Sequence, residues 1–180
     1  MKSVPLPIRT KKQLAIEAEE LIRSFYGRSV SRISVIEVGA SLSILELAPD
    51  TPLRIGSPGA VLTKTNRLHH QLRFDDRIGW CCVSTEGSRA SPARRVVQLG
   101  HSRLARKVEK YMDGTDTRRV SLLTSPALGL RALLVEDPAQ IIPLARAPGV
   151  CLRTGHTYDW EVFLSRLGTC RCHGGLLLAK

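Results

Sequence analysis

The stretch "NRLHHQLRFDDRIGWCC", residues 66–82, decides the fold that the sequence predicts. Between residues 68 and 74, apolar residues alternate with polar ones at a period of two, which is typical of a β-strand. The alternation resumes at residue 78 after Asp-Asp-Arg, so a β-hairpin is expected. The expected cross-strand pairs are Phe74–Ile78, Leu72–Trp80, His70–Cys82 and His69–Cys81.

The histidines and cysteines of this hairpin are also residue types that bind metals. A zinc site needs four ligands, commonly supplied as closely spaced pairs. Near the C-terminus, Cys170, Cys172 and His173 form a Cys-x-Cys-His run, but the usual two residues between cysteines are missing. We therefore expect no resident cofactor and a core role for the hairpin residues. Zinc at Cys170, Cys172 and His173 is the alternative.

Periodic patterns extend outward from the hairpin in both directions. A helix is expected over residues 11–26, opened by a Thr10–Gln13 capping box, with Phe25 on its buried apolar stripe. Two segments, "ISVIEV" at residues 33–38 and "LSILEL" at residues 42–47, share one pattern of apolar residues, Ser and Glu. This similarity predicts a second hairpin with its turn at residues 39–41. Later expected elements are a strand ending at Gly100, a helix from Ser102 to about Met112, a strand at 130–135, a short helix from Asp137 and a helix after Thr157.

This order of elements indicates the fold class. Runs of strands with few helices between them favour an α+β protein. We expect one domain over residues 1–180, with a mainly antiparallel sheet built from hairpins and about three helices packed on one face.

The net charge of the chain is high and unevenly distributed. Lys and Arg number 27 against 16 Asp and Glu, a net charge of +11. Residues 89–119 hold nine cations and three acids, so this segment supplies +6 of the excess. GC-rich coding drift could also raise the Arg content, but drift scatters charge whereas binding gathers it. The clustering favours a polyanionic partner.

The helix expected from Ser102 would present a cationic face. Four of its cations fall at i, i+3, i+4 and i+7, within an arc of about 100°. Leu104, Val108 and Tyr111 form the stripe expected to dock the helix. Outward cations bind phosphates with release of counterions. The predicted nucleic-acid contacts are Arg94, Arg95, Arg103, Arg106, Lys107, Lys110, Arg118 and Arg119.

Duplex DNA or structured RNA is the expected form of the nucleic acid. Single-strand binding needs aromatic side chains on which bases stack. The chain has 2 Trp, 3 Tyr and 3 Phe, and Phe25, Phe74 and Trp80 are expected in the core. Binding through the phosphate backbone is therefore the better prediction.

Two other functions stay open. His101 and His156 would be the acid–base residues of a small enzyme acting on a phosphate-containing or other anionic substrate, if the fold brings them into one pocket. The common nucleotide-binding, zinc-protease and serine-hydrolase motifs are absent, so the catalytic residues stay unassigned. The third function is a regulatory domain that binds an acidic protein.

The chain is expected to be soluble and cytoplasmic, with no membrane partner. No run approaches the roughly 20 apolar residues of a membrane span. "MKSVPLPIRTKKQ", residues 1–13, lacks the apolar centre of a secretory signal. Five cysteines without a disulfide-framework spacing suit a reducing compartment.

Overall fold

The structure is a computed structural model, which describes residues 4–26, 37–47, 57–74, 77–86, 93–100, 102–112, 119–148 and 150–174. In chain order its elements are α1 (Ile8–Tyr26), β1 (Glu37–Glu46), α2 (Pro58–Val61), β2 (Thr63–Phe74), β3 (Arg77–Thr85), β4 (Arg95–Gly100), α3 (Ser102–Met112), β5 (Val120–Ser125), η2 (Pro126–Leu128), β6 (Leu130–Val135), β7 (Gln140–Pro143), β8 (Tyr158–Asp159) and α4 (Trp160–Gly174).

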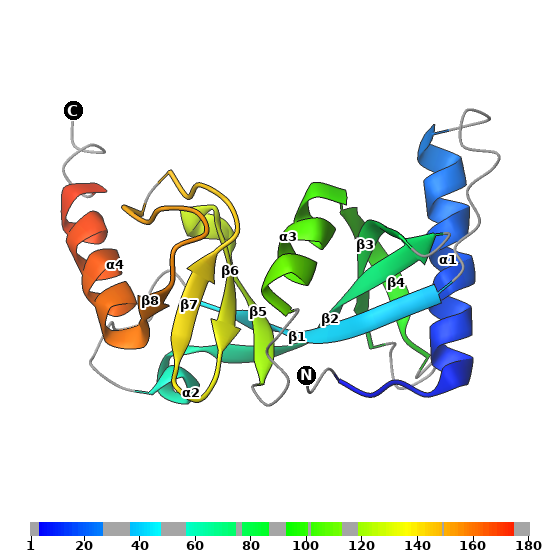
Figure 1. The fold of residues 1–180 in the computed structure, drawn as a ribbon, viewed down its shortest axis with the longest axis horizontal. Helices are drawn as coiled ribbons and strands as arrows, with labels where there is room; N and C mark the ends of the chain where they lie inside the picture. Colours follow the sequence, from blue (N-terminus) through cyan, green and yellow to red (C-terminus); the bar gives the residue numbers. More distant parts are fainter. Residues whose placement is uncertain are drawn as a thin grey trace. The chain divides into compact units, whose positions relative to one another are not determined.

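The strands form a mixed, mostly antiparallel sheet. They pair in the order β4-β3-β2-β1-β5-β6-β7-β8. The β1–β5 pair is parallel, whereas β2–β3, β3–β4, β5–β6, β6–β7 and β7–β8 are antiparallel. Three longer helices, α1, α3 and α4, accompany the sheet (Figure 1). The predicted α+β class is confirmed.

The chain divides into two compact units. The first unit comprises residues 1–43 and 66–116, and the second comprises residues 44–65 and 117–180. Each unit has its own hydrophobic core, one beneath α1 and one beneath α4. Because β1 and β2 run through both units, this division does not by itself define two domains, and the expected single domain stays a prediction.

The hairpin of residues 66–82 is present as β2 and β3. Leu72 pairs with Trp80 and His70 with Cys82, as predicted. The other two predicted pairs are wrong, because Phe74 pairs with Arg77 and His69 with Val83. A β-bulge after Leu72 shifts the register by one residue at Gly79, where a side chain would overlap the Phe74 ring.

In the first unit the sheet is covered on both faces. Leu72 packs in the core beneath α1. The next residue back, Gln71, donates from Nε2 to the Ala105 carbonyl oxygen of α3 at 3.3 Å. Successive strand residues point to opposite faces. Helices α1 and α3 therefore lie on opposite faces, with β2, β3 and β4 between them (Figure 1), whereas the sequence predicted helices on one face.

Helix α1 matches its predicted stripe in part. The predicted capping box is wrong, because the helix begins at Ile8 and Thr10 lies within its first turn. Leu14 and Ile22 are buried as predicted. Phe25 is the exception, since its side chain is 74% exposed near the end of the helix. Within the described part of the chain, no helix has the length and apolar character needed to cross a membrane.

The predicted hairpin between residues 33–38 and 42–47 is wrong. Residues 37–46 form one continuous strand, β1, and residues 33–36 lie outside the described part. The residues expected to form the turn lie within this strand, where Ser41 is 1% exposed.

In the second unit, β5 pairs in parallel with β1, and β6, β7 and β8 continue the sheet by antiparallel pairing. Strand β6 has the predicted bounds, residues 130–135. The short helix predicted from Asp137 is wrong, because this residue has a φ of 69° in the turn between β6 and β7. Helix α4 begins at Trp160, since the two residues after Thr157 form β8 against β7.

Candidate nucleic-acid interface

Helix α3 has the predicted bounds and buries one of its sides. Ala105 and Val108 are fully buried, and Met112 is 5% exposed. Leu104 and Tyr111, which were predicted to dock the helix, are half-buried. The docking stripe is therefore rotated from the predicted one, because Ala105 allows the helix to approach the Gln71 side chain on the sheet.

The four predicted cations of α3 lie opposite this stripe. Arg103, Arg106 and Lys110 are exposed, and Lys107 is half-buried. At 100° per residue, the arc of these cations is centred about 180° from the buried stripe. The outward cationic face is thus present, and its contact with phosphate stays a prediction.

Two arginines of the sheet share the face that α3 covers. Thr85 pairs with Arg67 on one side and with Arg95 on the other. Cross-strand partners point to the same face of a sheet. Arg67 lies four residues before Gln71 on β2, so both side chains point to the face where Gln71 contacts α3. Arg95 is exposed, and Arg67 donates from Nη2 to Gln98 Oε1 at 3.3 Å. Sequence reasoning missed Arg67, although extending the β2 alternation back by two residues would have placed it.

We refer to these six cations together as the α3 surface. Its members are Arg67, Arg95, Arg103, Arg106, Lys107 and Lys110.

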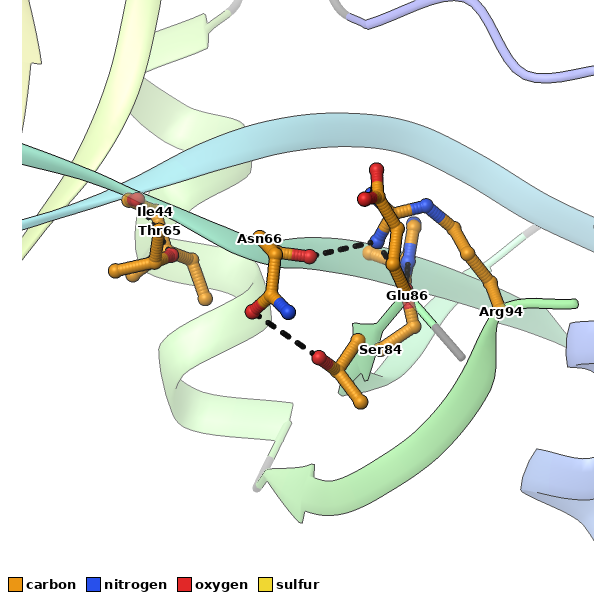
Figure 2. A network of polar contacts seen from close by, with 8 residues as sticks. Ile44, Thr65, Asn66, Ser84, Glu86 and Arg94 are labelled. Atoms are coloured by element: carbon orange, nitrogen blue, oxygen red, sulfur yellow. Dashed lines mark hydrogen bonds and ion pairs between the residues drawn. The ribbon is translucent and has the colours of Figure 1, made fainter. Parts of the chain in front are cut away.

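Arg94 does not belong to this surface, which corrects the position expected for it. Its side chain is 13% exposed, and Nη2 lies 2.9 Å from Glu86 Oε1. Nη1 donates to the Asn66 carbonyl oxygen at 3.2 Å and to Ser84 Oγ at 3.3 Å. Figure 2 shows the guanidinium beside the Asn66 carbonyl. The Arg94 guanidinium is bound by groups of β2 and β3 within the first unit and therefore connects these strands. We leave Arg94 out of the interface.

The last two predicted contacts cannot be assigned to the α3 surface. Arg118 lies outside the described residues. Arg119 is exposed at the start of β5, and it belongs to the second unit.

The histidine at the centre of the hairpin is a core residue. His70 is fully buried, and Nδ1 lies 2.9 Å from Ser41 Oγ while Nε2 lies 2.6 Å from Ser84 Oγ. Burial, and then electrostatic interactions with His69, Arg94 and Lys11, lower the pKa of His70 to about 3. The ring is therefore neutral with both nitrogens hydrogen-bonded, which leaves no free lone pair for a metal or for a proton from a substrate.

We expect the free energy of unfolding to fall as the pH drops below 6.5. The unfolded chain binds a proton at the ordinary pKa of 6.5, whereas His70 in the folded chain stays neutral down to about 3. Protons thus favour the unfolded state, at about 1.4 kcal/mol for each pH unit in this window. Urea unfolding followed by tryptophan fluorescence at pH 7.5, 6.0 and 5.0 measures the slope. An equally steep slope in the non-titrating variant His70→Gln would assign the effect to other groups.

Cys82 of the hairpin is not an activated thiol. Burial, and then Cys81 and Glu17, raise the pKa of the Cys82 thiol far above its usual range, so this side chain stays a neutral thiol. Cys151 is exposed in the second unit. The described residues include no group of three or more His, Cys, Asp or Glu that could hold a metal ion. The backbone of Cys170, Cys172 and His173 is helical in α4, and their side chains fall outside the description.

The two histidines proposed for catalysis are not brought into a described site. His101 lies outside the described residues. His156 is exposed in a turn whose backbone is held by Gly155, which donates to the Pro143 carbonyl oxygen at 2.8 Å. The Arg153 amide donates to Tyr158 Oη at 2.8 Å and closes the same turn. These contacts define a structural turn, and the pairing of His101 with His156 stays a prediction.

Known proteins offer no match to this arrangement. No protein-family model, curated protein or solved structure matches this chain. Function must therefore be inferred from the residues of the chain itself, and the α3 surface is the feature with the clearest chemistry.

Proposed function

We propose that this chain binds double-stranded DNA or structured RNA by contacting phosphates with the α3 surface. One observation carries the proposal. The cations of α3 face outward, opposite the stripe of Ala105 and Val108, and Arg95 with Arg67 lies on the same face of the sheet.

The composition of α3 supports a polyanionic ligand. Glu109 is its one acidic residue, against four cations. Gathered like charges repel one another and lower the stability of the folded state. Bound phosphates remove this repulsion and release condensed counterions.

The length of the cationic face suits a nucleic-acid backbone. Arg103 and Lys110 are seven residues apart, which is about 10 Å along a helix. A DNA strand carries one phosphate for about every 3.4 Å of helix axis. A face aligned with the helix axis of the duplex therefore spans about three successive phosphates. Tyr111, the one aromatic residue of α3, is half-buried, so stacking on single-stranded bases has little to contribute.

A salt titration tests the proposed function. We expect the affinity for a 24-base-pair DNA duplex or an RNA hairpin to fall linearly with salt on logarithmic axes, with a slope of about −3 to −5 for three to six phosphate contacts. Fluorescence anisotropy between 50 and 300 mM NaCl measures the slope. Absence of binding at 50 mM, or an affinity that does not change with salt, would disprove the proposal.

The chemistry of the described cysteines suggests where the protein acts. The described cysteines form no disulfide, which suits a reducing compartment. We therefore propose a cytoplasmic location, which fractionation of cells that express a tagged chain would test.

A further inference from the structure

A second surface lies on the opposite side of the first unit, between α1 and the edge of the sheet. A cavity of about 410 Å³ opens there, lined by Leu21 and Phe25 of α1, Trp80 of β3 and residues 96–100 of β4. We call it the α1–β4 groove. Its apolar side chains include Phe25, 74% exposed, and Val97, 52% exposed. Large apolar groups exposed side by side are characteristic of binding sites.

The groove runs along an edge strand. Of the strands that the structure describes, β4 is the last at its end of the sheet. Such edges can pair with an extended segment of another chain. Glu17 Oε2 accepts a hydrogen bond from the Val96 amide at 2.8 Å, which covers the beginning of the strand. The groove therefore offers an occupant the later part of the strand, from Val97 to Gly100.

The two sides of this edge differ in chemistry. Toward α1, Leu99 and Val96 pack with Trp80 and Leu14 in an apolar cluster. Toward α3, Arg95 is exposed at the beginning of β4, and exposed Arg103 lies in the first turn of α3, which follows the open end of the strand at Gly100. An extended peptide along β4 points successive side chains to these two sides alternately. Charge complementarity then requires apolar residues on one side of the peptide and acidic residues on the other.

We propose that the α1–β4 groove binds an extended segment of a partner protein in which apolar residues alternate with Asp or Glu. The cavity lies in the size range of small-ligand sites and admits two apolar side chains, spaced about 7 Å apart on one face of a strand. A second copy of this chain is a poor occupant, because its own β4 has the sequence "RVVQLG" and would bring a cation instead of acids to the cationic side of this edge. The proposal does not depend on nucleic-acid binding.

A labelled octapeptide of alternating Leu and Glu tests the proposal by fluorescence anisotropy with the full chain. We expect saturable binding that weakens at least 10-fold in the variant Phe25→Ser with Val97→Ser. Both side chains are mostly exposed, so the variant keeps its fold, as circular dichroism can verify. The matched control is Ile16→Ser, which removes an apolar side chain of α1 that is 59% exposed and outside the groove. It should bind the peptide like the unmodified chain.

Charge is tested with a second peptide in which Lys replaces Glu. We expect its affinity to be at least 10-fold lower. Equal binding of both peptides, no binding at 1 mM, or equal binding by Phe25→Ser with Val97→Ser and the unmodified chain would each overturn the proposal. Loss of duplex affinity in the groove variant, with no peptide binding, would make the groove part of a nucleic-acid site instead.

The two proposals fail separately in this design. A chain that binds the peptide but no duplex loses the proposed function alone. A chain that binds a duplex but no peptide loses the groove proposal alone.

Discussion

Replacing Arg103 and Lys110 with glutamate is expected to lower the affinity for a 24-base-pair duplex about 100-fold at 0.1 M salt. Both side chains are exposed on the outward side of α3. Each substitution removes one phosphate contact and places a carboxylate where a phosphate would lie. The loss corresponds to about 2.7 kcal/mol of binding free energy. Anisotropy titrations of the variant and the unmodified chain in the same buffer measure it.

A control with the same change in net charge separates the α3 surface from the charge of the whole chain. Arg9 and Lys12 are exposed on α1, which lies on the opposite face of the sheet in the first unit. Their replacement by glutamate also lowers the net charge from +11 to +7. We expect this control to change the affinity less than about 3-fold, because screening weakens charges beyond about 10 Å at this salt concentration.

The salt dependence gives a second readout of the same variants. The slope should fall by about 2 in the α3 variant and stay unchanged in the α1 control. Similar losses in both variants would mean that the chain attracts nucleic acid through its overall charge, and the α3 surface would have no special role.

Local periodicity predicted those parts of the fold that depend on neighbouring residues. The β2–β3 hairpin and the bounds of α3 followed from alternation and from the i, i+3, i+4, i+7 pattern, since both patterns are complete within 20 residues. The outward direction of the α3 cations followed for the same reason. The bulge at Gly79 escaped notice, because it depends on the contact of that residue with the Phe74 ring.

Long-range pairing decided the parts that were predicted wrongly. Residues 37–46 resemble a hairpin by composition, but their parallel pairing with β5 keeps β1 continuous. The residues after Asp137 have a helical start signal, yet β7 pairs with β6 and β8. In each case the partner strand supplies hydrogen bonds that outweigh local propensity.

The candidate site shows the same division between local and distant information. The pattern along α3 placed four cations correctly, whereas the role of Arg94 depends on Glu86 and on a carbonyl of β2. The spacing of residues along the sequence does not predict such partners. The exposure of Phe25 also depends on a distant element, because the position of β4 decides how much of the α1 stripe is covered.

The substitution His70→Leu is expected to lower the free energy of unfolding by about 2 to 4 kcal/mol at pH 7.5. The apolar side chain of leucine can occupy the buried position of His70. It leaves the hydroxyl of Ser41 without its histidine partner and removes one partner of Ser84, at 2.9 and 2.6 Å in the native chain. Buried polar groups without a partner cost about 1 to 3 kcal/mol each. Urea denaturation measures the change.

A double-mutant cycle shows whether this cost comes from the hydrogen bond. Adding Ser41→Ala to His70→Leu removes the orphaned hydroxyl, so we expect the two changes to be non-additive by about 1 to 2 kcal/mol. The matched control is Ser24→Ala, which removes an exposed hydroxyl that bonds the Leu21 carbonyl within α1. That pair should be additive within about 0.5 kcal/mol. Additivity in both cycles would mean that His70 stabilises the first unit by packing alone, because a hydrogen bond across the buried pair must appear as coupling between its two partners.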